Sequence, residues 1–271
     1  SVQLSTGEEV RGDVLIGADG SRSAVRSALL ASLGEPPCEP TFQDILSWWS
    51  RVPLTAVEGF SELDETNLPR GTAKSYKGPG LVFVLARSVV DADIYWSGFQ
   101  LVHEKPESRP DDYRHQCLEV FASCHPAVLQ AIEASAPGRV AGALISDLDP
   151  PPNSWSDGRV VLIGDAAHAM TPFIGQGANS AMLDAYILCK QLAFRADDGD
   201  WEGAFAKYAA SRQAVATKKI EEARKMARVF MTDSKLHTWG FNAFMRLVPK
   251  FVIEKQFTDM DEGNSLELDL S

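Results

Sequence analysis

The chain has 271 residues, 45% of them hydrophobic and 23% charged, which is typical of a globular protein with a buried core. Its formal net charge of −11 argues against nucleic acid as a partner, and no apolar run is long enough to span a membrane. The four cysteines match neither a disulfide framework nor a zinc motif. We therefore expect a cytoplasmic protein with reduced thiols, no bound metal and no transmembrane segment.

The first 34 residues predict a hairpin followed by a strand and a helix. Residues 1–10 have the pattern of a hairpin, and residues 13–20 contain a short apolar strand that ends in an Asp-Gly pair. Ser21 is expected to cap a helix that runs to about Leu33.

A Pro-rich stretch at residues 35–40 marks a boundary, and the pattern beyond it is that of an antiparallel sheet. Residues 77–80 predict a turn between two of its strands. The expected strands cover residues 42–54, 73–76, 81–86, 93–103 and 140–148, and the expected helices cover 113–123, with Cys117 and Cys124 on one face, and 127–134.

Residues 158–192 have the most specific pattern in the chain. A buried strand at 160–163 is followed by Gly164 and Asp165, then by a loop with glycine and proline, then by a helix. Asp165 alone could equally bind a ligand or cap the next helical turn, but the glycines of the loop favour a ligand. A helix start offers free N–H groups and a positive dipole end, so this segment predicts a cofactor site. The apolar positions of the helix are Ala178, Ala181, Met182, Ala185, Leu188 and Leu192.

The remainder of the chain predicts two helices and a tail. A long charged helix is expected at 201–232, a helix with an aromatic face at 241–252, and a loose acidic tail at 259–271. The inward side of the long helix is expected to comprise Phe205, Tyr208, Ala209, Val215, Ile220, Ala223 and Ala227.

These motifs resemble those of a known family. Residues 158–192 resemble the second FAD-binding motif of the class A flavoprotein monooxygenases, and residues 13–29 resemble their middle Asp-Gly motif, with salicylate-hydroxylase-like members most similar. The resemblance implies an α/β, three-layer FAD-binding domain of the glutathione-reductase type, with an inserted antiparallel-sheet substrate domain and C-terminal helices. The expected boundaries are 1–34 and 151–195 for the FAD-binding domain, 35–150 for the substrate domain, 196–258 for the C-terminal helices and 259–271 for the tail.

The resemblance also implies roles for individual residues. Asp165, after Gly164, would bind the ribityl hydroxyls of FAD. The amides of Gly177, Ala178 and Asn179, after Gly175, would face the pyrimidine edge of the flavin, and Pro172 would lie beside the ring. Asp19 and Gly20 would meet the ribose and pyrophosphate region, with Arg22 and Arg26 near phosphates or NAD(P)H.

Other side chains leave two interpretations open. His168 is either an acid–base group or a packing and orienting group, and the second is favoured. Arg51 is either a catalytic residue that reaches the substrate or a solvated arginine at a strand end. The aromatic residues Trp48, Trp49, Tyr95, Trp96 and Phe99 either line a substrate cavity or pack in the core.

The resemblance implies an enzyme that uses FAD, NAD(P)H and O2 to hydroxylate or epoxidise an aromatic or other apolar small molecule, in secondary metabolism or aromatic catabolism. Residues 1–34 contain no Gly-x-Gly-x-x-Gly loop, so we expect an N-terminally truncated form of the fold. The alternative is a non-catalytic remnant, or a subunit that needs a partner with the ADP-binding unit. A homodimer or a complementing N-terminal portion are the expected assemblies.

Overall fold

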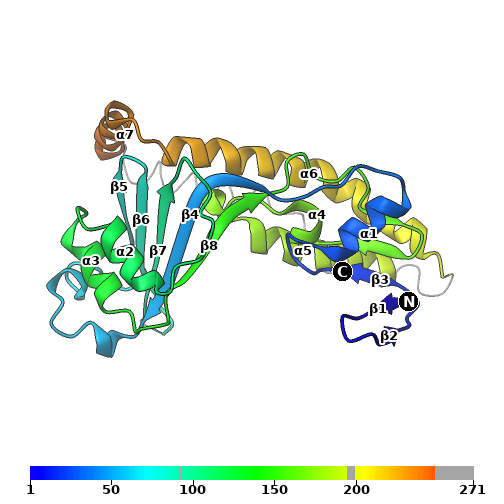
Figure 1. Cartoon of the computed structure of the whole chain (residues 1–271), viewed down its shortest axis with the longest axis horizontal. Helices are drawn as coiled ribbons and strands as arrows, with labels where there is room; N and C mark the ends of the chain where they lie inside the picture. The colour runs from blue at the N-terminus through cyan, green and yellow to red at the C-terminus, as the bar shows by residue number, and fades with distance from the viewer. Residues whose placement is uncertain (92, 194–198, 248–271) are drawn as a thin grey trace. The chain divides into compact units, whose positions relative to one another are not determined.

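A computed structural model describes residues 1–91, 93–193 and 199–247 of the chain (Figure 1). The residues form two compact units. The described part of the first contains residues 1–49, 102–113, 140–193 and 199–230, and that of the second contains residues 50–91, 93–101, 114–139 and 231–247. The region 35–150, predicted to be one sheet domain, therefore contributes to both units.

The first unit contains a small sheet made from strands that lie far apart in the sequence. Strand β3 (Leu15–Gly17) is parallel to β10 (Val160–Leu162), which pairs antiparallel with β9 (Ser156–Asp157). The predicted N-terminal hairpin is confirmed as β1 (Val2–Gln3) and β2 (Glu9–Val10). The parallel pair brings the two strand ends that carry Asp-Gly and Gly-Asp to the same edge.

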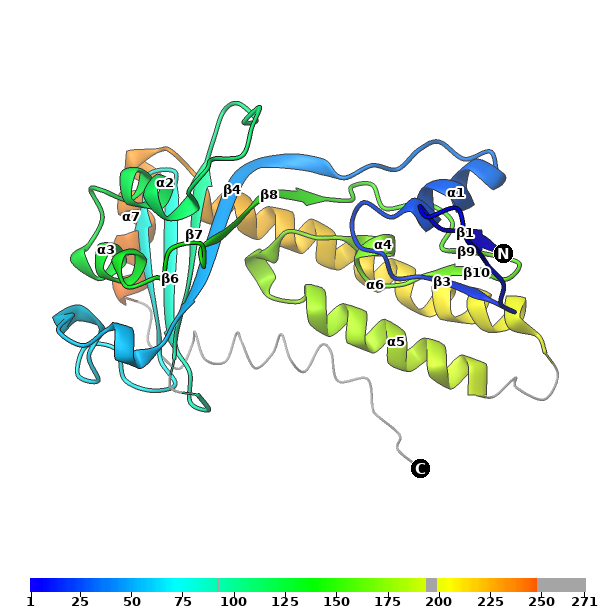
Figure 2. The ribbon, with the colours of Figure 1, turned by 60° about the horizontal axis from the view of Figure 1, so that its bottom comes forward.

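Helices pack against this sheet and against one another. They are α1 (Ala24–Ser32), the short α4 (Asp165–His168), α5 (Gly177–Ala193) and α6 (Trp201–Phe230), with a 3-10 turn, η3 (Pro172–Ile174), before α5. Helix α5 lies along α6 in both views (Figure 2). The predicted cap of α1 was wrong. Ser23, not Ser21, is the N-cap, because its hydroxyl accepts a hydrogen bond from the Arg26 amide at 2.8 Å.

The core of the first unit joins β10 to both long helices. It contains apolar residues from four segments, namely Leu29, Trp155, Val161, Leu162, Ala167, Leu188, Phe205, Tyr208, Ala209 and Ala216. The predicted inward side of α6 is confirmed except at Val215, which is 41% exposed. Its place is taken by Arg212 and Ala216, which continue the i, i+4 line that begins at Tyr208.

The buried line of α5 also differs from the prediction. Its inward residues are Ser180, Asp184 and Leu188, whereas Ala178 and Met182 are exposed. Two polar side chains therefore occupy the inner face of α5, together with Leu188 from the predicted apolar positions. The first unit also contains an antiparallel strand pair. Residues 41–49 of β4 (Thr41–Val52) pair with β8 (Ala141–Asp147), with a register shift between Phe42 and Leu46.

The second unit contains three of the antiparallel strands predicted from the sequence. Strands β5 (Ala73–Gly78), β6 (Leu81–Arg87) and β7 (Ile94–Leu101) form a meander. Phe83 stacks on Trp96 with ring centroids 5.1 Å apart, and the Trp96 indole N–H donates to Ser135 at 2.9 Å. The two aromatic rings therefore pack in the core, and the polar N–H of Trp96 has a hydrogen-bond partner.

Short helices complete the second unit. They are η1 (Leu54–Ala56), η2 (Ser61–Leu63), α2 (Tyr113–Val120), which begins at the boundary of the units, α3 (Pro126–Glu133) and α7 (Lys235–Leu247). Because α2 ends at Val120, Cys117 and Cys124 do not share a helix face as predicted. Helix α7 starts earlier than predicted. The predicted residues 248–252 and the tail 259–271 lie outside the described residues. Among the described helices, none combines the length and apolar character needed to cross a bilayer.

Truncation of a core side chain of α6 should destabilise the first unit. Phe205→Ala removes a fully buried ring, and we expect it to lower the free energy of unfolding by about 3–5 kcal/mol. Val215→Ala on the same helix should change it by less than about 0.5 kcal/mol. Urea denaturation followed by circular dichroism measures both values. Equal losses for the two variants would contradict the observed packing of α6.

Candidate cofactor-binding site

A cleft of about 610 Å³ lies in the first unit at the ends of β3 and β10. The carboxyl ends of parallel strands are where α/β folds bind ligands. The cleft brings together Gly20 from the N-terminal segment and most of the predicted residues of the 158–192 segment. Its lining comprises Ala18, Gly20, Ile163, Gly164, Asp165, Met170, Thr171, Pro172, Gly175, Gly177, Ala178 and Ala181.

Gly164 and Asp165 form the strand-end wall of this cleft. Gly164 has φ +58° and ψ −141°, a conformation that only glycine adopts readily, and a Cβ atom there would lie 3.1 Å from the Cβ of Ala181. Asp165 follows as the first residue of α4 and is exposed. Its carboxylate makes no hydrogen bond within the described residues. Asp165 therefore makes no capping hydrogen bond among the described residues, and its oxygens are available to a ligand.

The start of α5 provides hydrogen-bond donors on the cleft. Gly177 and Ala178 line it, with Asn179 next along the helix. The first amide with a partner is that of Ser180, which donates to the Gln176 carbonyl at 2.9 Å. The three preceding amides have no hydrogen-bond partner in the part of the chain that the structure describes. Unpaired amides at a helix N-terminus attract negative charge or an electron-rich group.

Asp19 has a structural role that the sequence did not suggest. Its carboxylate accepts hydrogen bonds from the Ser23 hydroxyl at 2.5 Å and from the Ala24 and Val25 amides at 2.8 and 3.2 Å. Burial would raise the pKa of Asp19, but these hydrogen bonds outweigh it and hold the pKa below its ordinary value. Asp19 therefore anchors the start of α1. It does not line the cleft, so its predicted contact with a cofactor stays a prediction.

The two arginines that follow Asp19 differ in environment. Arg26 was expected near phosphates, but it is fully buried and its guanidinium donates to the backbone carbonyls of Ser21, Cys38 and Ala166. Because these donors are used within the protein, the expectation that Arg26 lies near phosphates or NAD(P)H was wrong. Arg22 is exposed outside the lining of the cleft, and its predicted role stays untested.

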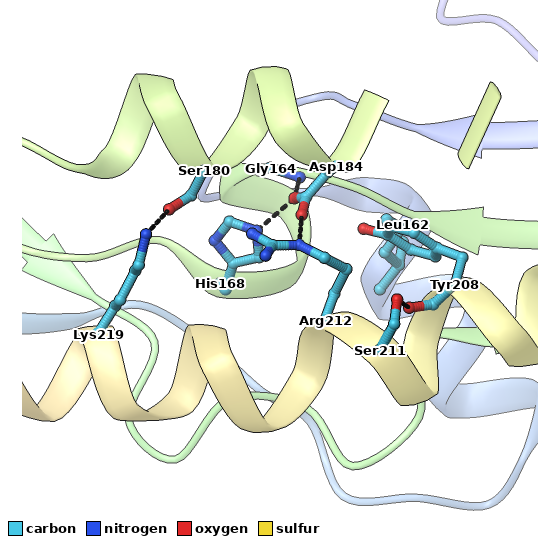
Figure 3. A network of polar contacts seen from close by, with 9 residues as sticks. All are labelled: Leu162, Gly164, His168, Ser180, Asp184, Tyr208, Ser211, Arg212 and Lys219. Atoms are coloured by element: carbon cyan, nitrogen blue, oxygen red, sulfur yellow. Dashed lines mark hydrogen bonds and ion pairs between the residues drawn. The ribbon is translucent and has the colours of Figure 1, made fainter. Parts of the chain in front are cut away.

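A buried polar network lies directly behind the Gly164 wall (Figure 3). Asp184 from α5 is fully buried, and its carboxylate accepts hydrogen bonds from the Gly164 amide at 2.9 Å and from the Arg212 Nε of α6 at 2.7 Å. His168, also fully buried, contacts the same carboxylate through Nε2. Burial would raise the pKa of Asp184, yet the hydrogen bonds from His168, Arg212 and Gly164 keep it below its ordinary value.

The sequence interpretation missed two members of this network. The favoured packing and orienting role of His168 agrees with its burial, but neither Asp184 nor Arg212 was selected. The available signal was that each charged residue occupies an inward position of a helix, Asp184 between Ser180 and Leu188 and Arg212 between Tyr208 and Ala216. Opposite charges at inward positions of consecutive helices predict a buried pair.

Arg51 lies in the second unit, in an exposed charged cluster. Its guanidinium pairs with Asp91 at 3.2 Å and with Asp93 at 2.5 Å, and it lies over the ring of Tyr95. These contacts agree with a solvated strand-end arginine, and its catalytic role stays a prediction. Of the aromatic residues, Trp48 and Trp96 are buried as core residues, whereas Trp49 and Tyr95 are exposed.

Comparison with known proteins agrees with this geometry. Residues 150–223, which contain the Gly164 wall, the glycine loop, α5 and Arg212, match the family described as FAD binding domain. The chain is 31% identical over 247 residues to the aurachin C monooxygenase/isomerase of Stigmatella aurantiaca, covering 91% of this chain and 59% of the relative. It is 32% identical over 228 residues to the FAD-dependent urate hydroxylase of Mycolicibacterium vanbaalenii, covering 83% of this chain and 53% of the relative.

Solved structures give the same result. The structure of Klebsiella pneumoniae HpxO complexed with FAD and uric acid matches with a TM-score of 0.78 and 26% identity, covering 94% of this chain and 61% of that one. The fold is thus that of an FAD-binding α/β domain. The chain is similar to FAD-dependent monooxygenases, and it spans between about half and three fifths of the length of these relatives.

Loss of the Asp19 carboxylate should weaken the start of α1. We expect Asp19→Ala to lower the free energy of unfolding by about 1 kcal/mol at neutral pH. Because the folded-state pKa of Asp19 is lowered, the stabilisation is complete above the ordinary aspartate pKa and is lost as the pH falls through the folded-state value. The difference between the two proteins should therefore shrink at acid pH. Denaturant unfolding at both pH values measures it, and Asp13→Ala, at an exposed site, is the control.

Proposed function

We propose that the cleft of the first unit holds the flavin and ribityl part of FAD, and that the chain forms part of an FAD- and NAD(P)H-dependent monooxygenase. The observation that carries this proposal is the free Asp165 carboxylate in the same cleft as the unpaired amides at the start of α5. A polyol chain needs hydroxyl acceptors, and an electron-rich ring edge needs N–H donors, so the two parts match the two halves of that group.

The remaining residues of the cleft fit a flat ring. Gly20, Gly175 and Gly177 have no heavy atom within 4 Å of where a Cβ would stand, so the backbone surface there is open to a ligand. Pro172 and Ala181 add apolar surface, and the buried hydroxyl of Thr171 has no partner among the described residues. FAD, when bound, supplies the redox chemistry with O2. The chain's own residues bind the cofactor, orient it and place the α5 amides where negative charge can be stabilised.

We propose an aromatic or other apolar small molecule as the substrate class, with hydroxylation or epoxidation as the reaction. The support comes from relatives, whose names specify an aurachin monooxygenase and a urate hydroxylase. A cytoplasmic location, a homodimer and assembly with a complementing N-terminal portion remain predictions.

A side chain at Gly177 should block cofactor uptake without affecting the fold. Gly177 lines the cleft and no atom lies within 4 Å of its Cβ position, so Gly177→Val should fold normally and weaken FAD binding by about tenfold or more. Quenching of flavin fluorescence on titration with FAD measures the affinity. Gly240→Val, at a helical glycine of the second unit with equally open surroundings, is the control. Unchanged affinity for Gly177→Val would contradict the proposed position of the flavin.

The reaction class can be tested with isotopically labelled oxygen. With FAD, NAD(P)H and an aromatic substrate that is consumed, we expect one labelled oxygen atom from O2 in the product, detected by mass spectrometry. The same reaction in labelled water with ordinary O2 is the control. A chain that binds FAD and oxidises NAD(P)H without transferring the label would be a reductase, and this result would contradict the monooxygenase assignment.

A further inference from the structure

We propose that Asp184 and Arg212 are positioning residues of the flavin site, and that they hold the Gly164–Asp165 turn in its ligand-binding conformation from behind the cleft. Neither residue lines the cleft, and both lie in the buried network of Figure 3. The inference rests on the proposed flavin site, because the residue whose position they determine is Asp165.

The geometry ties both ends of the turn to one atom. Asp184 Oδ2 accepts the hydrogen bond of the Gly164 amide at 2.9 Å and also contacts Nε2 of His168. These two residues bracket α4, and Gly164 closes the turn by accepting the His168 amide at 2.9 Å. Asp165 lies between the two tethers and is exposed. The direction of its carboxylate is therefore set by a segment that is fixed at both ends.

The conformation of Gly164 needs such a tether. Its φ of +58° with ψ of −141° is sparsely populated, so a strand end without external contacts would populate other backbone conformations as well. The amide hydrogen bond to Asp184 favours this one conformer. Ala181, one turn before Asp184 on α5, packs against the same glycine and leaves little room for a side chain there.

Arg212 stabilises the buried carboxylate of Asp184. Asp184 is fully buried, and an unpaired charge in that position is strongly disfavoured. Arg212 donates from Nε to Oδ1 at 2.7 Å, which balances the charge and leaves Oδ2 for Gly164 and His168. One oxygen of Asp184 therefore binds Arg212 of α6, and the other oxygen binds the turn that carries Asp165.

A second buried ion pair on α6 provides a matched comparison. Arg224 donates to Asp147 from Nε and Nη2, each at 2.6 Å, and Asp147 is fully buried. Arg224 lies about 18 Å along the helix from Arg212. Neither Arg224 nor Asp147 lines the cleft. Loss of this pair should affect stability in a similar way without any effect on the flavin turn.

The experiment compares matched variants of the full chain. Asp184→Asn and Arg212→Met test the network, and Asp147→Asn and Arg224→Met are their controls. FAD affinity is measured by flavin fluorescence, the environment of the bound flavin by its visible absorption spectrum, and stability by denaturant unfolding. Arg212→Lys keeps the charge and serves as the conservative variant if Arg212→Met does not fold.

We expect the network variants to weaken FAD binding by about tenfold or more, the scale on which residues that orient a ligating side chain act in metal sites. Their bound-flavin spectrum should also shift, and Arg212→Lys should recover part of the affinity. The control variants should lose stability but keep affinity and spectrum. A double-mutant cycle should show that Asp165→Ala and Asp184→Asn are not additive in FAD affinity, since both remove the same contact.

The outcomes separate the two proposals. If the unaltered chain takes up no FAD, the proposed function fails and the inference fails with it. If the unaltered chain binds FAD and Asp184→Asn binds it with equal affinity and spectrum, the inference alone is overturned. Additive losses in the cycle, or equal losses of affinity in the control variants, would assign Asp184 and Arg212 to stability only and would also overturn it.

Discussion

The arrangement of the first unit depends on the hydrogen bonds that the buried carboxylate of Asp184 accepts. A buried carboxylate without partners is disfavoured by several kcal/mol, so the fold must bring donors to it. The donors come from three places in the chain, the end of β10, the α4 turn and α6. One charge thus fixes the strand end, the turn and two helices together. A purely apolar contact could not do this, because apolar packing has no direction.

Local patterns predicted most of the secondary structure, because period and turn chemistry are properties of short segments. The apolar run at 81–86 and the strand at 160–163 became β6 and β10, and the glycine loop after residue 171 leads into α5 as expected. Six of the residues predicted for the site in the 158–192 segment line the cleft, and a strand, a glycine loop and a helix start are consecutive there in the sequence.

Features that depend on partners distant in the sequence could not be predicted in the same way. The inner face of α5 carries Asp184, which pairs with Arg212 on another helix, whereas Met182, one of the apolar positions of α5, is 63% exposed. Arginine is a common phosphate ligand, but Arg26 donates one of its hydrogen bonds to the carbonyl of Ala166, 140 residues further along the chain. In each case a tertiary hydrogen bond overrides a local preference that is worth a fraction of a kcal/mol.

The parallel pairing of β3 with β10 has a consequence for how the chain reaches its functional form. The register joins Leu15 to Val160, so one edge of the cleft comes from the start of the chain and the other from beyond its middle. Contacts of such sequence separation form slowly, because the loop between them must be closed before they contribute. A ligand that touches both edges binds only after that closure, and it would stabilise the folded unit by mass action. During synthesis, β3 can pair with β10 only after residue 160 has left the ribosome.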